Sequence, residues 1–80
     1  MAVRRVRFTF PEELIREPLI YNLGHQFQVI TNVRMADVDE KTGWVLLELE
    51  GDPTEIDRSI AWAQQKGVRV DPAGGDILEG

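Results

Sequence analysis

The sequence has 80 residues, enough for one small domain, and its formal net charge of −5 disfavours binding to nucleic acid, which depends on cationic side chains. The absence of cysteine excludes disulfides, thiolate metal sites and iron–sulfur clusters, and with a single histidine we expect no metal site and no cofactor. Because a chain without cysteine or an apolar run of about 20 residues suits the cytosol, we expect a cytoplasmic protein without membrane insertion.

The first expected element is a strand over residues 3–10, because apolar and polar side chains alternate there. Its two faces consist of Val6, Phe8 and Phe10 on the apolar side and Arg5, Arg7 and Thr9 on the polar side. A helix is expected next, with Pro18 in its first turn and an apolar stripe of Leu19, Ile20, Leu23 and Phe27. We expect Gly24 to let this helix approach the sheet closely and His25 to face solvent.

Two further strands are expected to form a hairpin. Residues 29–38 are extended, and residues 39–43 form a turn with Gly43 available for a positive φ. The third strand covers residues 43–50. One of its faces consists of Val45, Leu47 and Leu49, and the other of Trp44, Leu46, Glu48 and Glu50.

The second helix has defined ends. Asp52 is the expected N-cap, Pro53 is the first helical residue, Glu55 follows the cap at the spacing of a capping box, and Gly67 terminates the helix. Its inner stripe consists of Ile56, Ser59, Ile60 and Ala63. Trp62 lies off this stripe, which leaves open whether it packs at a flank or meets a partner.

A short last strand at residues 68–70 completes the order β-α-β-β-α-β. We expect residues 1–71 to form one domain and residues 72–80 a flexible tail. This order predicts an α+β protein with the ferredoxin-like fold, a four-stranded antiparallel sheet with both helices on one face. The other face of the sheet is then free of helices, and we expect the function to reside there or on an edge strand.

Several segments together are similar to a known family. The run from Val29 to Val38, the strand that begins Gly43-Trp44, the Asp52-Pro53 helix start and the strand after Gly67 resemble the NIL domain, over roughly residues 3–71. That domain is the C-terminal regulatory part of methionine-importer ABC transporter ATPases. Asn32 stands at the position of the asparagine that names the family, and Val33 and Arg34 stand where isoleucine and leucine are expected.

The resemblance implies an ACT-like fold, pairing of two domains through their sheets, and a methionine-type ligand at the paired region. The sequence holds no phosphate-binding Walker loop, so we expect a free-standing, non-enzymatic sensing or regulatory module. The expected partners are a second copy of the chain, a small amino acid, and a transporter or an enzyme of sulfur metabolism. Arg34 leaves the preference for methionine open, since a guanidinium can meet a carboxylate or exclude an apolar ligand.

The candidate ligand-binding residues are Asn32, Arg34 and Met35. We expect Asn32 and Arg34 to hold the polar ends of an amino acid, with Met35 as an apolar wall. In the alternative interpretation Asn32 satisfies backbone groups, Arg34 is solvated or pairs with Asp37 or Glu48, and Met35 belongs to the core.

The candidate interface residues are Trp44 and Leu46, which we expect on the helix-free face, where a second copy pairs. An alternative function is a protein-interaction adaptor that uses the open face or an edge strand and binds no small ligand. An RNA-recognition motif has the same element order. It is disfavoured because Leu46 replaces a stacking aromatic residue, and Glu48 and Glu50 repel phosphate.

Overall fold

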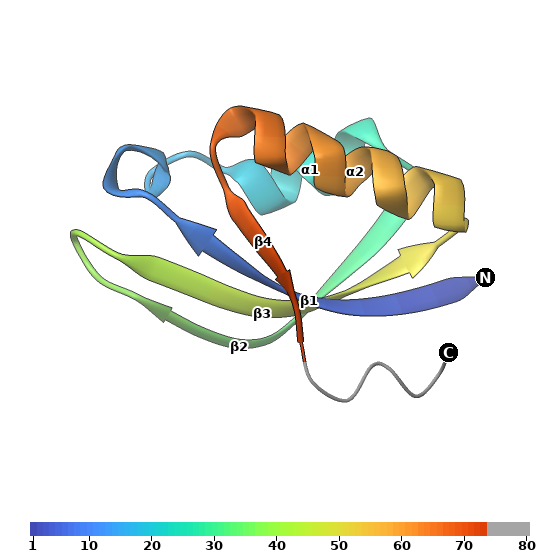
Figure 1. Ribbon diagram of the computed structural model, residues 1–80, viewed down its shortest axis with the longest axis horizontal. Helices are drawn as coiled ribbons and strands as arrows, with labels where there is room; N and C mark the ends of the chain where they lie inside the picture. The colour runs from blue at the N-terminus through green and yellow to red at the C-terminus, as the bar shows by residue number, and fades with distance from the viewer. Residues whose placement is uncertain (74–80) are drawn as a thin grey trace.

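The computed structural model describes residues 1–73 as one antiparallel sheet with two helices packed on one of its faces (Figure 1). The elements are β1 (Ala2–Phe10), a 3₁₀ turn (Glu12–Leu14), α1 (Leu19–Gln26), β2 (Val29–Val38), β3 (Gly43–Gly51), α2 (Pro53–Lys66) and β4 (Arg69–Pro72). The strand order β2-β3-β1-β4 is that of the ferredoxin-like fold, which confirms the predicted architecture. Pro72, which the sequence assigned to the tail, is the last residue of β4, and residues 74–80 of the predicted tail lie outside the described residues.

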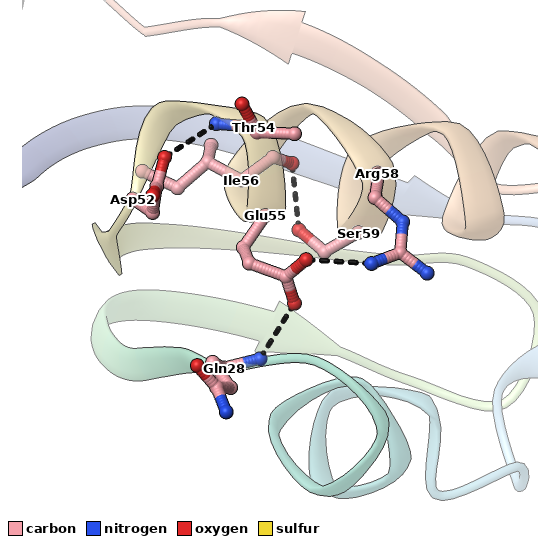
Figure 2. Close-up of polar contacts among 7 residues, drawn as sticks. All are labelled: Gln28, Asp52, Thr54, Glu55, Ile56, Arg58 and Ser59. Carbon is pink, nitrogen blue, oxygen red and sulfur yellow. Dashed lines mark hydrogen bonds and ion pairs between the residues drawn. The ribbon is translucent and has the colours of Figure 1, made fainter.

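The ends of α2 follow from local sequence. The Asp52 carboxylate accepts a hydrogen bond from the Thr54 backbone N–H at 3.1 Å, and Pro53 occupies the first turn (Figure 2). Gly67 adopts a φ of 108° and donates its N–H to the carbonyls of the last turn. Glu55 differs from the capping-box prediction, because its carboxylate accepts from the backbone N–H of Gln28 at 3.0 Å instead of reaching back to the cap.

Two further local predictions, for Pro18 and Gly43, are wrong. Pro18 is the N-cap of α1 instead of a residue in its first turn. Gly43 has no positive φ; the turn before it is closed by the Asp39 carboxylate, which accepts from the backbone N–H groups of Lys41 and Thr42, each at 2.8 Å. These N–H groups, Thr42 first and then Lys41, lower the pKa of Asp39.

The hydrophobic core lies between the sheet and the helices. Most of its members come from β1, β3 and both helices, and they include Val6, Phe8, Phe10, Leu19, Leu23, Val45, Leu47, Leu49 and Ile56. Ser59 is fully buried among them, and its hydroxyl donates to the Ile56 carbonyl at 2.8 Å, so its polar group is satisfied. Ile60 is only partly buried and packs at the margin of this core.

The far half of β2 extends beyond the helices. From Asn32 to Val38 every residue of this edge strand is exposed, while β3 beside it alternates between buried and half-buried residues. The helix-free side of the sheet is therefore continuous with an exposed edge. Among residues 1–73 no helix is both long and apolar enough to cross a membrane.

Candidate functional site

The site is the helix-free face of the sheet, called here the open face. Side chains alternate between the two faces of the sheet along each strand, and paired residues of neighbouring strands lie on the same face. The register of the four strands therefore shows which residues belong to the open face. They are Ile30, Asn32, Arg34, Met35 and Asp37 on β2; Trp44, Leu46, Glu48 and Glu50 on β3; Val3, Arg5, Arg7 and Thr9 on β1; and Arg69 and Asp71 on β4.

A β-bulge in β2 brings the three candidate ligand-binding residues to this face. Val33 pairs with Leu47 and Met35 with Leu46, so Arg34 is an extra residue between two consecutive partners. In a regular strand Met35 would point to the side opposite Asn32. The bulge resets the alternation, and Met35 joins the open face. Its side chain is 59% exposed, so the alternative that it belongs to the core is wrong.

Glu48 is the centre of the polar contacts on the open face. The Arg5 guanidinium donates to its carboxylate at 2.8 Å, and Asn32 is its cross-strand partner on β2. The pKa of Glu48 is lowered, chiefly by the hydrogen bond from Arg5 and further by the charge of Arg34 and by the Asn32 side chain. Arg5 is thus the hydrogen-bonded partner of this carboxylate, and Asn32 is its neighbour on the adjacent strand. Within the described part of the chain Arg34 itself forms no ion pair.

Trp44 and Leu46 form the apolar part of the open face, and both are half-buried. The Arg7 guanidinium lies over the Trp44 ring, with its carbon 4.8 Å from the ring centroid. Leu46 is flanked by Arg7 on β1 and by Met35 on β2. The open face thus has an apolar centre bordered by guanidinium and amide groups.

The open face is also formally neutral. Four of the nine basic residues and four of the fourteen acidic residues of the sequence lie on it. The net charge of −5 therefore arises entirely from other residues. A second copy of the chain can approach this face without the repulsion that the total charge would suggest.

The remaining surface offers less for chemistry. A mostly apolar pocket of about 230 Å³ lies on the helix side, between the start of α1 and the end of β2, and its walls include Phe10, Leu19 and Val38. His25 is exposed and stacks on Tyr21, with ring centroids 4.2 Å apart. In residues 1–73 there is no group of three side chains that could hold a metal ion.

Comparison with known proteins identifies the family. The family model of the NIL domain matches residues 4–72 of the sequence. The chain belongs to the NIL domain family. The resemblance read from the sequence is thereby confirmed, and the NIL match covers all the strands and helices of the structure except the first residues of β1.

Relatives of this NIL domain are parts of longer proteins. The methionine import ATP-binding protein MetN 1 of Salmonella typhimurium is 30% identical over 77 residues, which cover 91% of this chain and 22% of that protein. The methionine import ATP-binding protein MetN of Lacticaseibacillus paracasei is 28% identical over 80 residues, 95% of this chain and 22% of that protein. The chain thus spans about a fifth of these relatives.

A solved structure has the same fold. The C-terminal domain of an ABC transporter ATP-binding protein from Enterococcus faecalis superposes with a TM-score of 0.77 at 20% identity, covering 90% of this chain and 84% of that one. At this identity the likeness concerns the fold. It agrees with the ferredoxin-like arrangement of the NIL domain described above.

Sequence reasoning missed the contacts of three members of the site. Arg5, Arg7 and Glu48 were assigned to polar strand faces, but nothing local indicated that Arg5 would hold Glu48 or that Arg7 would cover Trp44. The alternation of residues 3–10 was the available signal, since it placed both arginines on the face opposite Val6. Which groups they meet depends on the register between β1 and β3.

Proposed function

We propose that this NIL domain is a non-enzymatic regulatory module that binds a small amino acid on the open face. The observation that carries the proposal is the β-bulge, which gathers Asn32, Arg34 and Met35 beside the apolar centre at Leu46. Bulges occur often at sheet edges beside functional sites, where they re-aim a side chain. Amide, guanidinium and thioether groups together suit a ligand with a charged end and an apolar body.

We further propose that two copies pair through their open faces. A single sheet face leaves most of a small ligand in water, whereas ligand sites usually enclose most of the bound molecule. The half-buried Trp44 and Leu46 supply apolar contact area, and the neutrality of the face removes a Coulombic barrier. In this arrangement the ligand lies between two sheets and stabilises the dimer.

The relatives' names suggest the setting of this regulation. They are methionine import ATP-binding proteins, so we propose a role in the cytoplasm in controlling a transporter or an enzyme of sulfur amino-acid metabolism. Stabilisation of the dimer by the bound ligand would be the signal that such a partner reads.

Thermal unfolding with a panel of amino acids tests the proposal. A ligand that binds only the folded state raises the melting temperature with concentration, and the Asn32→Ala variant should weaken this rise. His25→Ala, which changes an exposed helix residue away from the open face, is the control and should respond like the unmodified protein. A flat response across the whole panel contradicts amino-acid binding.

The second candidate is a protein-interaction adaptor, and the observation that favours it is the free edge of β2. Ile30, Val33, Met35 and Val38 on this strand are each 51–60% exposed, and no strand of the described residues pairs with its outer edge. Such an edge can accept an added strand from another protein. The adaptor is favoured if the amino-acid panel gives no response while an extended peptide partner binds and protects β2 amides from hydrogen exchange.

A further inference from the structure

The apolar pocket beside the start of α1 continues into an acidic hollow. The pocket has a volume of about 230 Å³, and the hollow, of about 980 Å³, lies between the connector that follows β1 and the turn between β2 and β3. Ile15 lines both, and Figure 1 shows the connector and the turn at the same end of the molecule. We infer that this end of the domain is a docking site for a basic segment of a partner protein. One apolar side chain of that segment enters the pocket, between flanking lysine or arginine residues.

The pocket suits a single apolar side chain. Three of its lining residues, Phe10, Leu19 and Val45, belong to the buried core. Val38 and Tyr21 also line it and are 52% and 64% exposed. Sites that enclose a small ligand usually measure about 300–1,000 Å³, so this pocket is small for that purpose. An anchor side chain of a partner protein fills such a pocket and brings apolar area out of water.

The walls of the pocket and the hollow carry most of the net charge of the protein. Among the lining residues that the structure describes, the acidic ones are Glu12, Glu13, Glu17, Asp39 and Glu40, and the basic one is Arg16. Five negative charges and one positive charge give −4, against −5 for the whole sequence. Lysine or arginine residues beside the anchor are therefore the complementary charges.

Other occupants fit this site less well. β4 runs antiparallel to β1, and the backbone N–H of Ala73 donates to the Arg5 carbonyl at 3.1 Å. The end of β4 therefore points away from Phe10 and the pocket. A second copy of the chain would bring the same acidic hollow and be repelled by it. The same charge repels nucleic acid and anionic lipid surfaces.

The docking site and the open face lie on opposite sides of the sheet. Phe10 and Val45 belong to the core under the helices, whereas Thr9 and Trp44 beside them belong to the open face. Both surfaces can therefore be occupied at the same time. The inference goes beyond the proposed function and does not depend on amino-acid binding or on pairing of open faces.

Titration of the full chain with labelled peptides, followed by fluorescence anisotropy, tests the inference. The probe peptide has two lysines on each side of a central leucine. One comparison peptide has serine at the centre, and another has glutamates in place of the lysines. We expect the leucine peptide to bind at least about tenfold more tightly than the serine peptide, as burial of one leucine side chain implies. The glutamate peptide should not bind.

Val38→Ser and Val33→Ser form a matched pair on β2. The two valines are 52% and 51% exposed, and of the two Val38 lines the pocket. Val38→Ser should weaken binding of the leucine peptide about threefold or more, because apolar contact is lost, and Val33→Ser should leave it unchanged.

Glu13→Lys and Asp57→Lys form a second pair, which separates local charge from total charge. Both positions are exposed, and Glu13 lines the acidic hollow, whereas Asp57 lies on α2 beside Arg4. Glu13→Lys should weaken binding of the leucine peptide about threefold, and Asp57→Lys should weaken it less, since only the first places a like charge beside the lysines.

Four results would overturn the inference. They are no binding of the leucine peptide at millimolar concentration, equal binding of the leucine and serine peptides, equal effects within either pair of variants, and binding of pentylamine as tight as that of the leucine peptide. The last would indicate a site for small amines. The response of the protein to the amino-acid panel is measured separately, so the proposed function stands or fails independently of these results.

Discussion

Gly51, the last residue of β3, lies directly against the backbone of Gln28. A Cβ atom at Gly51 would be 2.7 Å from the Gln28 carbonyl oxygen, closer than real Cβ atoms come to backbone. This contact fixes the end of β3 against the start of β2, where Val29 pairs with Gly51. Neither the hairpin pattern in the sequence nor the spacing of its elements predicted this close contact between Gly51 and Gln28.

We predict that Gly51→Ala destabilises the protein by about 1–3 kcal/mol, because a backbone atom has to move to admit the methyl group. Urea unfolding followed by circular dichroism measures the change. Gly24→Ala is the matched control in α1, where the nearest atom to an added Cβ is at 3.8 Å and the added methyl group favours the helix by about 0.5–1 kcal/mol. Equal stability of the two variants would refute the prediction.

The Gly24 contact also corrects an expectation from the sequence. A glycine beside the apolar stripe of α1 suggested a close approach of helix and sheet. The observed distances are ordinary van der Waals contacts, so the approach does not require a glycine. The position with a steric need for glycine is Gly51.

Stability should fall in acid. The pKa values of Asp39, Glu48 and Glu55 are lowered below their ordinary values of 3.8, 4.5 and 4.5, by hydrogen bonds from Thr42, Arg5 and Gln28 first of all. The unfolded chain therefore binds more protons at low pH, and the free energy of unfolding decreases as the pH falls from about 5 through these lowered values. Urea unfolding at a series of pH values measures this slope.

Glu55 offers the sharpest test of that slope. Its carboxylate accepts from the Gln28 backbone N–H at 3.0 Å and from Arg58 at 2.6 Å, and so joins α2 to the start of β2 (Figure 2). Glu55→Gln removes the titrating group and should flatten the acid dependence. Glu13→Gln, an exposed acid without such contacts, is the control and should leave the slope as it is. An unchanged slope in Glu55→Gln speaks against the assignment.

Trp62 and Phe27 should stabilise the packing of α1 on α2 together. Their rings meet edge to face with centroids 6.0 Å apart, which answers the question that the sequence left open for Trp62. A double-mutant cycle with Trp62→Leu and Phe27→Leu should give a coupling energy of about 0.5–1.5 kcal/mol from denaturant unfolding. Additive effects of the two substitutions would show that the rings do not interact.

Trp44→Glu should prevent the proposed pairing of open faces, because the carboxylate introduced in each copy would face the apolar centre of the other copy. Sedimentation equilibrium should give a dimer for the unmodified protein and a monomer for the variant. Tyr21→Glu, an exposed aromatic residue on the helix side, is the control and should remain dimeric. Circular dichroism checks that each variant is folded. Monomers for the unmodified protein at all concentrations contradict the dimer.

The sequence predicted the element order, both faces of β1 and β3, the ends of α2 and the NIL family. These features are local or depend on a simple period: side chains alternate along a strand, an aspartate caps a helix and a glycine ends it. For the same reason Trp44 and Leu46 could be assigned to the helix-free face before any coordinates. The turn at Asp39 was placed correctly, although its hydrogen bonds differ from the expected glycine turn.

The tertiary structure alone decided how the candidate site is assembled. The bulge at Arg34 exists because β2 pairs with β3 in two registers, and it moves Met35 onto the face of Asn32. The contact of Arg5 with Glu48 likewise requires the register of β1 against β3. A sequence specifies the period of each strand by itself, whereas the register is set by packing and hydrogen bonding between strands that are distant along the chain.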